Sequence, residues 1–237
     1  MKKLLGVLLL LTTIPSIAQD QSTTSRVMDL TVGIGGNQTS LSASYQFAWK
    51  FGKKQKLELG AGVRMNTLLS NNTYYVTAPA KLVKGESGPA ALFKDKIPAN
   101  MDSVHLPSGR IGALNILLSI GYRFSDRWRA GFNIDVIGFS FGRDQPGTYI
   151  NGSFSQQVTA SPSGFNLLLV GENDLGSLNS EFFAAYRIKN KLWVKAGIQH
   201  IFMEYTTSTK AQQLPEPNDR FRITPTIFCF GVIYAMK

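Results

Sequence analysis

Apolar and polar residues alternate along most of the chain after Met28. Between residues 57 and 66, one face carries Leu57, Leu59, Ala61, Val63 and Met65, and the other carries Glu58, Gly60, Gly62, Arg64 and Asn66. Successive side chains of a strand point to opposite sides, so such a segment has one wholly apolar face. Comparable alternation predicts strands at 30–34, 41–51, 57–66, 114–123, 128–136, 178–188, 192–198 and 221–234. We therefore expect an all-β fold of about eight strands, most of them near the 9–11 residues that a tilted membrane-spanning strand requires.

The connections between these strands differ in length from one end to the other. Short turns at 52–55, 125–127 and 189–191 fall at one end if the strands run up and down, and long loops near 70–109, 143–176 and 209–220 fall at the opposite end. Short turns on one side and long loops on the other are typical of outer-membrane barrels. We predict an up-and-down antiparallel transmembrane β-barrel over residues 28–237. Pairing of 167–170 with 149–158 leaves a ten-strand barrel as the alternative.

Aromatic residues gather beside the short turns. Trp49 ends one predicted strand, and Trp128 and Trp193 each begin another. Indole rings favour the headgroup level of a bilayer, where one side of the ring is apolar and the other is wet. We expect all three tryptophans to be membrane-interface anchors.

The first eighteen residues have the pattern of an export signal. Lys2 and Lys3 precede an apolar stretch at 4–11, and the segment ends on the small-residue site 16–18. A basic start, a short apolar region and a small-residue site define a cleaved signal peptide, and the stretch is too short to span a bilayer. We predict a signal peptide over 1–18, cleaved on export, and a short periplasmic segment over 19–27.

In these features the chain resembles the small outer-membrane β-barrels of Gram-negative bacteria, and it is similar in plan to the OmpA transmembrane domain. The resemblance rests on architecture and covers nearly all of residues 28–237. It implies a location in the cell outer membrane. It also implies outer-membrane lipids, including lipopolysaccharide, and the outer-membrane assembly machinery as partners. Barrels of this kind often end on an aromatic residue, whereas here Tyr234 is followed by three further residues.

Charged residues lie on the polar faces of the predicted strands. They are Asp29, Lys50, Glu58, Arg64, Arg123, Arg129, Asp135, Glu181, Arg187 and Lys195. The lumen of an eight-stranded barrel is only wide enough to be filled by side chains. We therefore expect a lumen ion-pair network that fills the barrel. An ion or proton path is the alternative, because charges inside a membrane often mark pathways.

Candidate catalytic and metal-binding residues are few. The alternation breaks after Gln199, and we expect a β-bulge near 199–201 that turns His200 and Glu204 inward. With a nearby serine (Ser177, Ser180 or Ser208) these two side chains could form a hydrolase site. No recognisable hydrolase motif surrounds any of these serines, so we expect no enzymatic activity and no catalytic residues.

The loop residues Glu172, Asn173 and Asp174 offer oxygen atoms to a calcium ion. Their spacing does not match that of an EF-hand loop, and a hydrogen-bonded turn explains them better. His105, in the first long loop, has no candidate ligands at useful spacing. We expect no metal ion and no cofactor.

Composition and charge limit the function classes further. Charged residues make up 17% of the 237 residues, against about 25% in ordinary soluble domains. A mean hydropathy of -0.03 excludes a bundle of membrane helices. The excess of Lys+Arg (25) over Asp+Glu (15) gives a net charge of +10, but the basic residues are scattered, which argues against a nucleic-acid partner. Four loop lysines could attract lipopolysaccharide phosphates: Lys81, Lys84, Lys94 and Lys96.

The sequence thus favours a structural or surface-interaction protein of the outer membrane, acting through its extracellular loops. One alternative is a lipid A or phospholipid hydrolase that uses His200. Another is a soluble exported barrel that binds lipid. It is disfavoured because its interior would be apolar, whereas the polar faces here carry the charges.

Overall fold

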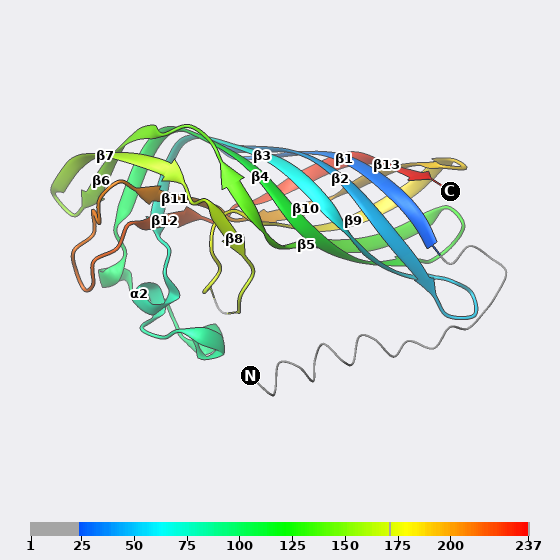
Figure 1. Ribbon diagram of the computed structural model, residues 1–237, viewed down its shortest axis with the longest axis horizontal. Coiled ribbons are helices and arrows are strands. Elements are labelled where there is room, and N and C mark those ends of the chain that lie inside the picture. The colour runs from blue at the N-terminus through cyan, green and yellow to red at the C-terminus, as the bar shows by residue number, and fades with distance from the viewer. Residues whose placement is uncertain (1–23, 171, 237) are drawn as a thin grey trace.

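The computed structural model describes residues 24–170 and 172–236, and these residues form one large antiparallel β-structure (Figure 1). The predicted signal peptide lies outside the described residues. The thirteen described strands are β1 (Thr24–Gly35), β2 (Gln38–Phe51), β3 (Leu57–Thr77), β4 (Ser103–Arg123), β5 (Trp128–Phe141), β6 (Gln145–Asn151), β7 (Phe154–Pro162), β8 (Phe165–Leu167), β9 (Asn179–Lys189), β10 (Leu192–Ile201), β11 (Met203–Thr207), β12 (Arg220–Ile223) and β13 (Thr226–Met236). Strand β1 therefore begins within the segment predicted to precede the barrel.

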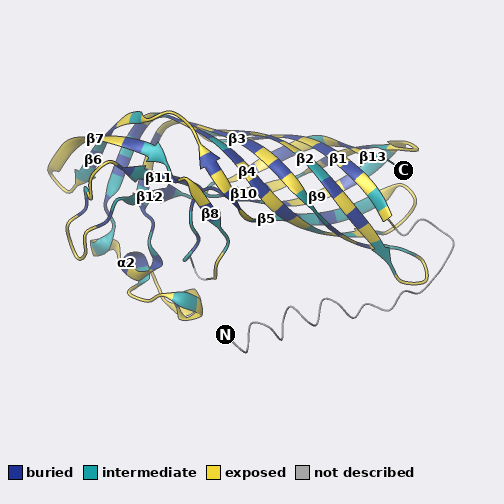
Figure 2. Cartoon of the chain, viewed as in Figure 1, coloured by how far each residue is buried: buried dark blue, intermediate teal, exposed yellow. Residues whose placement is uncertain are grey.

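Eight of these strands close into a ring, here called the barrel ring. Neighbouring pairs run β1–β2–β3–β4–β5–β9–β10–β13, and β13 pairs with β1 to close the ring. The short turns β2–β3, β4–β5 and β9–β10 lie at one end, where β1 also begins and β13 ends (Figure 1). Within the barrel ring, buried and exposed residues alternate along each strand (Figure 2).

A second, smaller ring extends the barrel at its other end. It consists of β6, β7, β11, β12 and the distal halves of β3 and β4, and it closes because β12 pairs with β3. We call it the extension. Strand β8 adds to β5 beside it. The predicted count of about eight strands, or ten, is therefore wrong for the sheet as a whole, because much of the predicted long loops at 70–109 and 143–176 is folded into strands.

The side of the sheet that faces inward changes where the barrel ring meets the extension. On β3, Leu68 and Ser70 are buried, Asn71 and Asn72 are both exposed, and burial then resumes at Thr73 with the opposite parity. Asn72 has φ +46°, and the β3–β4 pairing skips Asn72 and Pro107, which cannot donate a ladder hydrogen bond. This irregular pair interrupts the alternation, which explains why the strands there were predicted to be loop.

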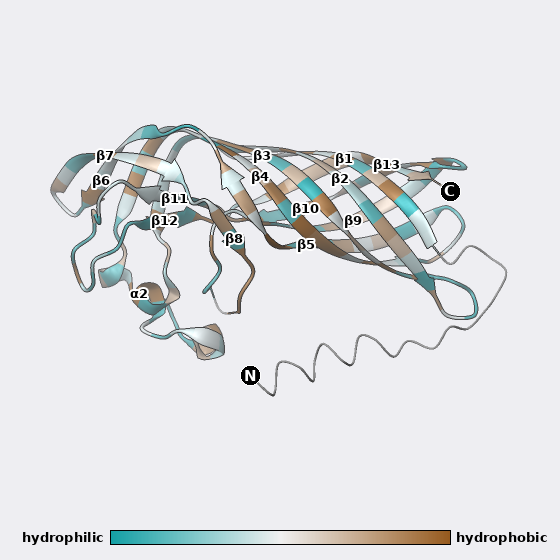
Figure 3. Ribbon diagram, viewed as in Figure 1, coloured by the Kyte–Doolittle hydropathy of each residue, from teal (hydrophilic) through white to brown (hydrophobic). Residues whose placement is uncertain are grey.

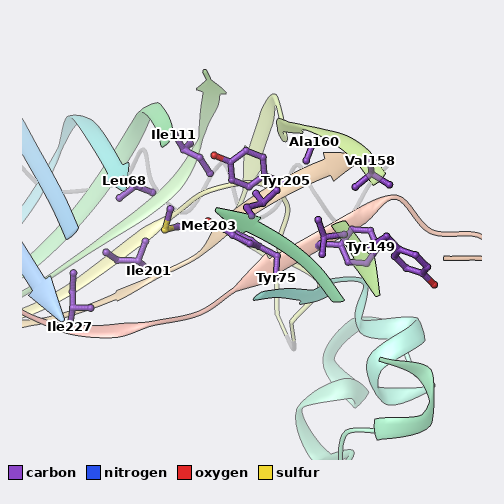
Figure 4. Close-up of a cluster of buried hydrophobic side chains, with 13 residues drawn as sticks. Leu68, Tyr75, Ile111, Tyr149, Val158, Ala160, Ile201, Met203, Tyr205 and Ile227 are labelled. Atoms are coloured by element: carbon purple, nitrogen blue, oxygen red, sulfur yellow. The ribbon is translucent and has the colours of Figure 1, made fainter. Parts of the chain in front are cut away.

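The extension encloses an apolar core (Figure 4). Tyr75 and Tyr205 pack edge to face, with ring centroids 5.1 Å apart. The Tyr205 hydroxyl accepts the backbone N–H of Arg110 at 2.6 Å, and that of Tyr75 shares a 2.6 Å hydrogen bond with Ser70. The other core residues are Leu68, Val104, Leu106, Ile111, Tyr149, Val158, Ala160, Ile201, Met203, Phe221 and Ile227. The extension is thus packed like a soluble domain, apolar inside.

Residues 78–102 connect β3 to β4 and carry three short helices: α2 (Ala80–Lys84), η1 (Gly88–Phe93) and η2 (Pro98–Asn100). These helices lie beside the extension (Figure 1). None of the helices in the described part of the chain is long and apolar enough to cross a bilayer. The third predicted loop, 209–220, connects β11 to β12, and its last residue already belongs to β12.

Candidate functional site

The lumen of the barrel ring contains a buried cluster around Arg64 of β3 and Asp135 of β5. The Arg64 Nε atom donates to Asp135 Oδ1 at 2.8 Å, and Arg64 also donates to the carbonyl of Asn179 at the start of β9. Asp135 Oδ2 accepts from the side chains of Asn66 (3.1 Å) and Asn115 (2.8 Å) and from the Asn179 N–H (3.0 Å). A buried carboxylate needs this many donors, because burial removes its hydration. The cluster ties strands β3, β4, β5 and β9 together.

A second cluster surrounds Lys195 of β10. Its ammonium group lies between Asp29, at 2.6 Å, and Glu181. Gln199 donates to Glu181 at 3.0 Å and accepts a hydrogen bond from Ser40 of β2 at 2.5 Å. Glu181 also lies 3.9 Å from Arg64, so the two clusters form one network.

The third cluster lies toward the short-turn end and is centred on Glu58. Arg123 contacts one carboxylate oxygen of Glu58 at 2.6 Å, and Arg129 contacts the other at 3.3 Å. The guanidinium of Arg129 lies over the Trp193 ring, 5.0 Å from its centre. Arg187 lies over the same ring at 5.7 Å. Such contacts stabilise a cation whose hydration is restricted.

Eight of the ten predicted lumen residues therefore meet in ion pairs. Four of them are acidic and four are basic, so their formal charges balance. The described residues include no ion-pair partner for Lys50 or Arg187 within 4.0 Å. A cavity of about 40 Å³ remains beside Glu58 and Arg129. Because that volume has room for only a few water molecules, side chains fill most of this part of the lumen.

The three tryptophans do not share one environment. Trp49 and Trp128 point outward and are 43% and 52% exposed, whereas Trp193 is 3% exposed and points into the lumen. The prediction of an interface anchor at Trp193 is wrong. Val194, Ala196 and Ile198 face outward on β10, so the two-residue period places Trp193 inward with Lys195. The alternation of the strand therefore predicts the direction of the Trp193 side chain better than its position next to a short turn does.

The predicted pairing of His200 with Glu204 does not form. From Trp193 to Ile201, strand β10 pairs regularly with β9, and the break falls at Phe202 instead of at 199–201. His200 consequently stays on the exposed outer face, where its Nδ1 lies 2.9 Å from the Thr226 hydroxyl. Glu204 is buried after the break. Ile201, Met203 and Tyr205 all lie in the apolar core, so His200 and Glu204 both face away from it, and the expectation that they turn inward is wrong. Residues 174–177 cover Glu204, and no hydrogen bond in the described part of the chain joins it to His200.

Glu204 instead belongs to a buried cluster that the sequence reasoning missed. Arg220 donates two 2.9 Å hydrogen bonds to its carboxylate, and Arg222 donates another at 2.6 Å. Both arginines also donate to the carbonyl of Asp174. Burial opposes ionisation of Glu204, but the hydrogen bonds and charges of the two arginines outweigh it and hold the Glu204 pKa below its usual value. The sequence signal for this cluster was the pair of arginines two residues apart, at 220 and 222, which places both side chains on one face of a short strand.

The pKa shift of Glu204 predicts an acid-sensitive extension. A carboxylate with a lowered pKa in the folded state contributes stability above its ordinary pKa, and this contribution is lost as the pH falls through the folded value. We expect Glu204→Gln to lower the local stability of β11 and β12 by about 1.5–3 kcal/mol at neutral pH, the range for hydrogen bonds to charged groups. Hydrogen exchange of the β11 and β12 amides across pH measures this. Equal acid sensitivity in the variant and the parent chain would contradict it.

The other candidate ligands are already bound to protein groups. Asp174 Oδ1 accepts the Leu169 N–H at 2.8 Å, and the Asn173 amide exchanges hydrogen bonds with Gly88. Glu172 pairs with Lys84 at 3.3 Å and with Lys96 at 3.7 Å. This arrangement is a hydrogen-bonded turn. His105 contacts Asn72 at 2.7 Å on the outside of the extension.

The fold and the lumen together define a closed antiparallel β-barrel with an apolar outer wall and an ion-paired interior. Hydrophobic and hydrophilic residues alternate along the strands of the barrel ring (Figure 3), and the large hydrophobic ones are exposed. This is the reverse of a soluble lipid-binding barrel, whose interior would be apolar, and the buried charges of the lumen argue against that alternative.

Comparisons with known proteins add little to this picture. No protein-family model and no curated protein matches the chain. Among solved structures, Neisserial surface protein A is 9% identical, with 89% of this chain and 94% of that chain covered at a TM-score of 0.32. The Ralstonia pickettii toluene transporter is 9% identical, covering 90% and 89% at 0.26. An outer membrane channel from Pseudomonas putida F1 is 9% identical, covering 94% and 100% at 0.27. Scores this low establish neither a shared fold nor a shared function.

Proposed function

We propose that this protein is an integral outer-membrane β-barrel with a filled polar lumen, and that it serves a structural or surface-interaction role through the extension. The proposal rests on the wall of the barrel ring, which has its apolar side chains outside and its charged side chains inside. On β1, for example, Met28, Leu30, Val32 and Ile34 are all exposed. Exposed apolar area on this scale is costly in water, and it marks a membrane contact when it encircles a barrel.

The outward face of the other ring strands supports the same conclusion. Exposed apolar residues follow one another on β3 (Leu57, Leu59, Val63, Met65), on β4 (Leu114, Ile116, Leu118, Ile120) and on β13 (Phe228, Phe230, Val232, Tyr234). Their ionisable neighbours point into the lumen, where they are paired. Trp49 and Trp128 lie at the short-turn margin of this surface. We call the surface the apolar belt and place it in the bilayer.

The extension then projects from the membrane on the side opposite the short turns. It is a folded platform, because its apolar core fixes the strands that would otherwise be loose loops. The lysines of the 78–102 connection beside it are partly neutralised: Lys81 pairs with Glu216 at 2.6 Å, and Lys84 and Lys96 pair with Glu172. A role in surface interaction therefore rests on the shape of the platform more than on its positive charge.

Cell fractionation and conductance test this proposal together. We expect the full chain, expressed with its leader in a Gram-negative host, to be found in the outer-membrane fraction and to change its gel mobility on boiling. In planar bilayers the purified protein should give no steady conductance, because the lumen is filled with ion pairs. Recovery without detergent in a soluble fraction would overturn the membrane assignment, and regular conductance steps would overturn the filled lumen.

A further inference from the structure

Two segments far apart in the sequence expose apolar side chains beside the barrel. Leu92 and Phe93 end the 3₁₀ helix η1, and Phe93 is 88% exposed. Leu169 and Val170 follow β8 and are also exposed. Both segments project from the same side of the molecule, next to the loop end of the barrel ring (Figure 1).

Polar contacts join the two segments. The Asn173 side chain accepts the Gly88 N–H and donates to the Gly88 carbonyl, both at 3.1 Å. Glu172 binds Lys84 and Lys96, and the Lys84 ammonium also donates to the Ala91 carbonyl at 3.0 Å. These contacts fix η1 against the residues that follow β8. They also pair Lys84 and Lys96 with an acidic residue of the second segment.

The joined segments lie level with the apolar belt. Strand β8 pairs with Ile137–Phe139 of β5, and the Leu168 N–H donates to the Val136 carbonyl at 2.8 Å. Ile137 and Phe139 are exposed members of the belt, and Phe165 packs on Phe139 with ring centroids 5.9 Å apart. The chain therefore leaves the wall at Leu168, at a height where the wall itself is apolar and outward-facing.

We propose that Leu92, Phe93, Leu169 and Val170 form a foot that inserts into the acyl chains of the outer leaflet beside the barrel. The inference rests on the membrane location proposed above. Continuity with the belt supports a lipid occupant, since a polar partner would not match four apolar side chains beside Phe165 and Phe139. Glu172 offsets one of the two lysine charges, and the lysines are separate from the four apolar side chains, so they can stay at the headgroup level while the foot enters the acyl chains.

Site-specific labelling tests the foot in the full protein. The single native cysteine, Cys229, is buried, and Cys229→Ser gives a background for single-cysteine variants. Phe93→Cys places a fluorescent label on the foot, Leu118→Cys places one on the belt, and Phe154→Cys places one at the exposed β6–β7 hairpin of the extension. Each protein is reconstituted in phosphatidylcholine vesicles with bromine atoms along the acyl chains, and heat-dependent gel mobility verifies folding.

We expect the label at position 93 to be quenched to an extent similar to that at 118, and the label at 154 to be unaffected. Quenching at 118 without quenching at 93 would overturn the foot and leave the membrane barrel intact. Loss of quenching at both positions in folded protein would overturn the membrane location and the foot with it.

Discussion

Replacing Arg64 by leucine is expected to lower the free energy of unfolding by about 3–5 kcal/mol, the cost of breaking a buried ion pair by removing one partner. The variant leaves Asp135 fully buried without its cation, and it also removes the donor to the Asn179 carbonyl. Denaturant unfolding in detergent micelles, followed by tryptophan fluorescence, measures the change.

Two further variants make this experiment specific. Lys50→Met removes a half-buried lumen cation that has no ion-pair partner among the described residues, and we expect a much smaller loss. The double variant Arg64→Leu/Asp135→Leu removes both charges and should recover most of the stability lost in the single variant, because no buried charge is left unpaired. A double variant less stable than Arg64→Leu alone would contradict the account of the lumen.

Replacing Val63 by arginine is expected to cost about 2–4 kcal/mol in lipid vesicles, the range for a basic residue on the lipid face at the bilayer midplane. Val63 lies on the outward face of β3, within the apolar belt. Equilibrium unfolding from vesicles measures the effect.

The matched control is Phe154→Arg. Phe154 is an exposed apolar residue of the extension, and its replacement should stay within about 0.5 kcal/mol of the parent chain, as for ordinary surface substitutions. Equal effects of the two arginines would show that Val63 does not face hydrocarbon.

Alternation predicted the barrel-ring strands well where the apolar residues of a strand all stay on its outer face. Leu59, Val63 and Met65 face outward as expected, while Glu58 and Arg64 point into the lumen. The prediction failed where parity changes. Asn71 and Asn72 shift β3 from one face to the other, and beyond them apolar residues point inward, so the same rule that identifies lipid-facing strands misses the extension.

The candidate sites show the same limit of local reasoning. His200 and Glu204 are four residues apart, and a continuous strand would place them on one side. They do share one side, but it is the side away from the core, because Ile201, Met203 and Tyr205 occupy the inward positions. The partners of Glu204 and Asp174 come from β12, through the closure of the second ring, and those of Glu172 come from residues 84 and 96 of the connection beside it. The spacing of residues within one segment cannot predict contacts with segments so far away in the sequence.

Lipid quenching of the three tryptophans, one at a time, tests the central claim most directly. The claim is that the wall of the barrel ring faces a bilayer and its lumen does not. In variants that keep one tryptophan and carry phenylalanine at the other two positions, bromine atoms near the headgroups should quench Trp49 and Trp128. Trp193, enclosed beneath Arg129 and Arg187, should keep its fluorescence. Unquenched Trp49 and Trp128 in folded, vesicle-bound protein would contradict the account.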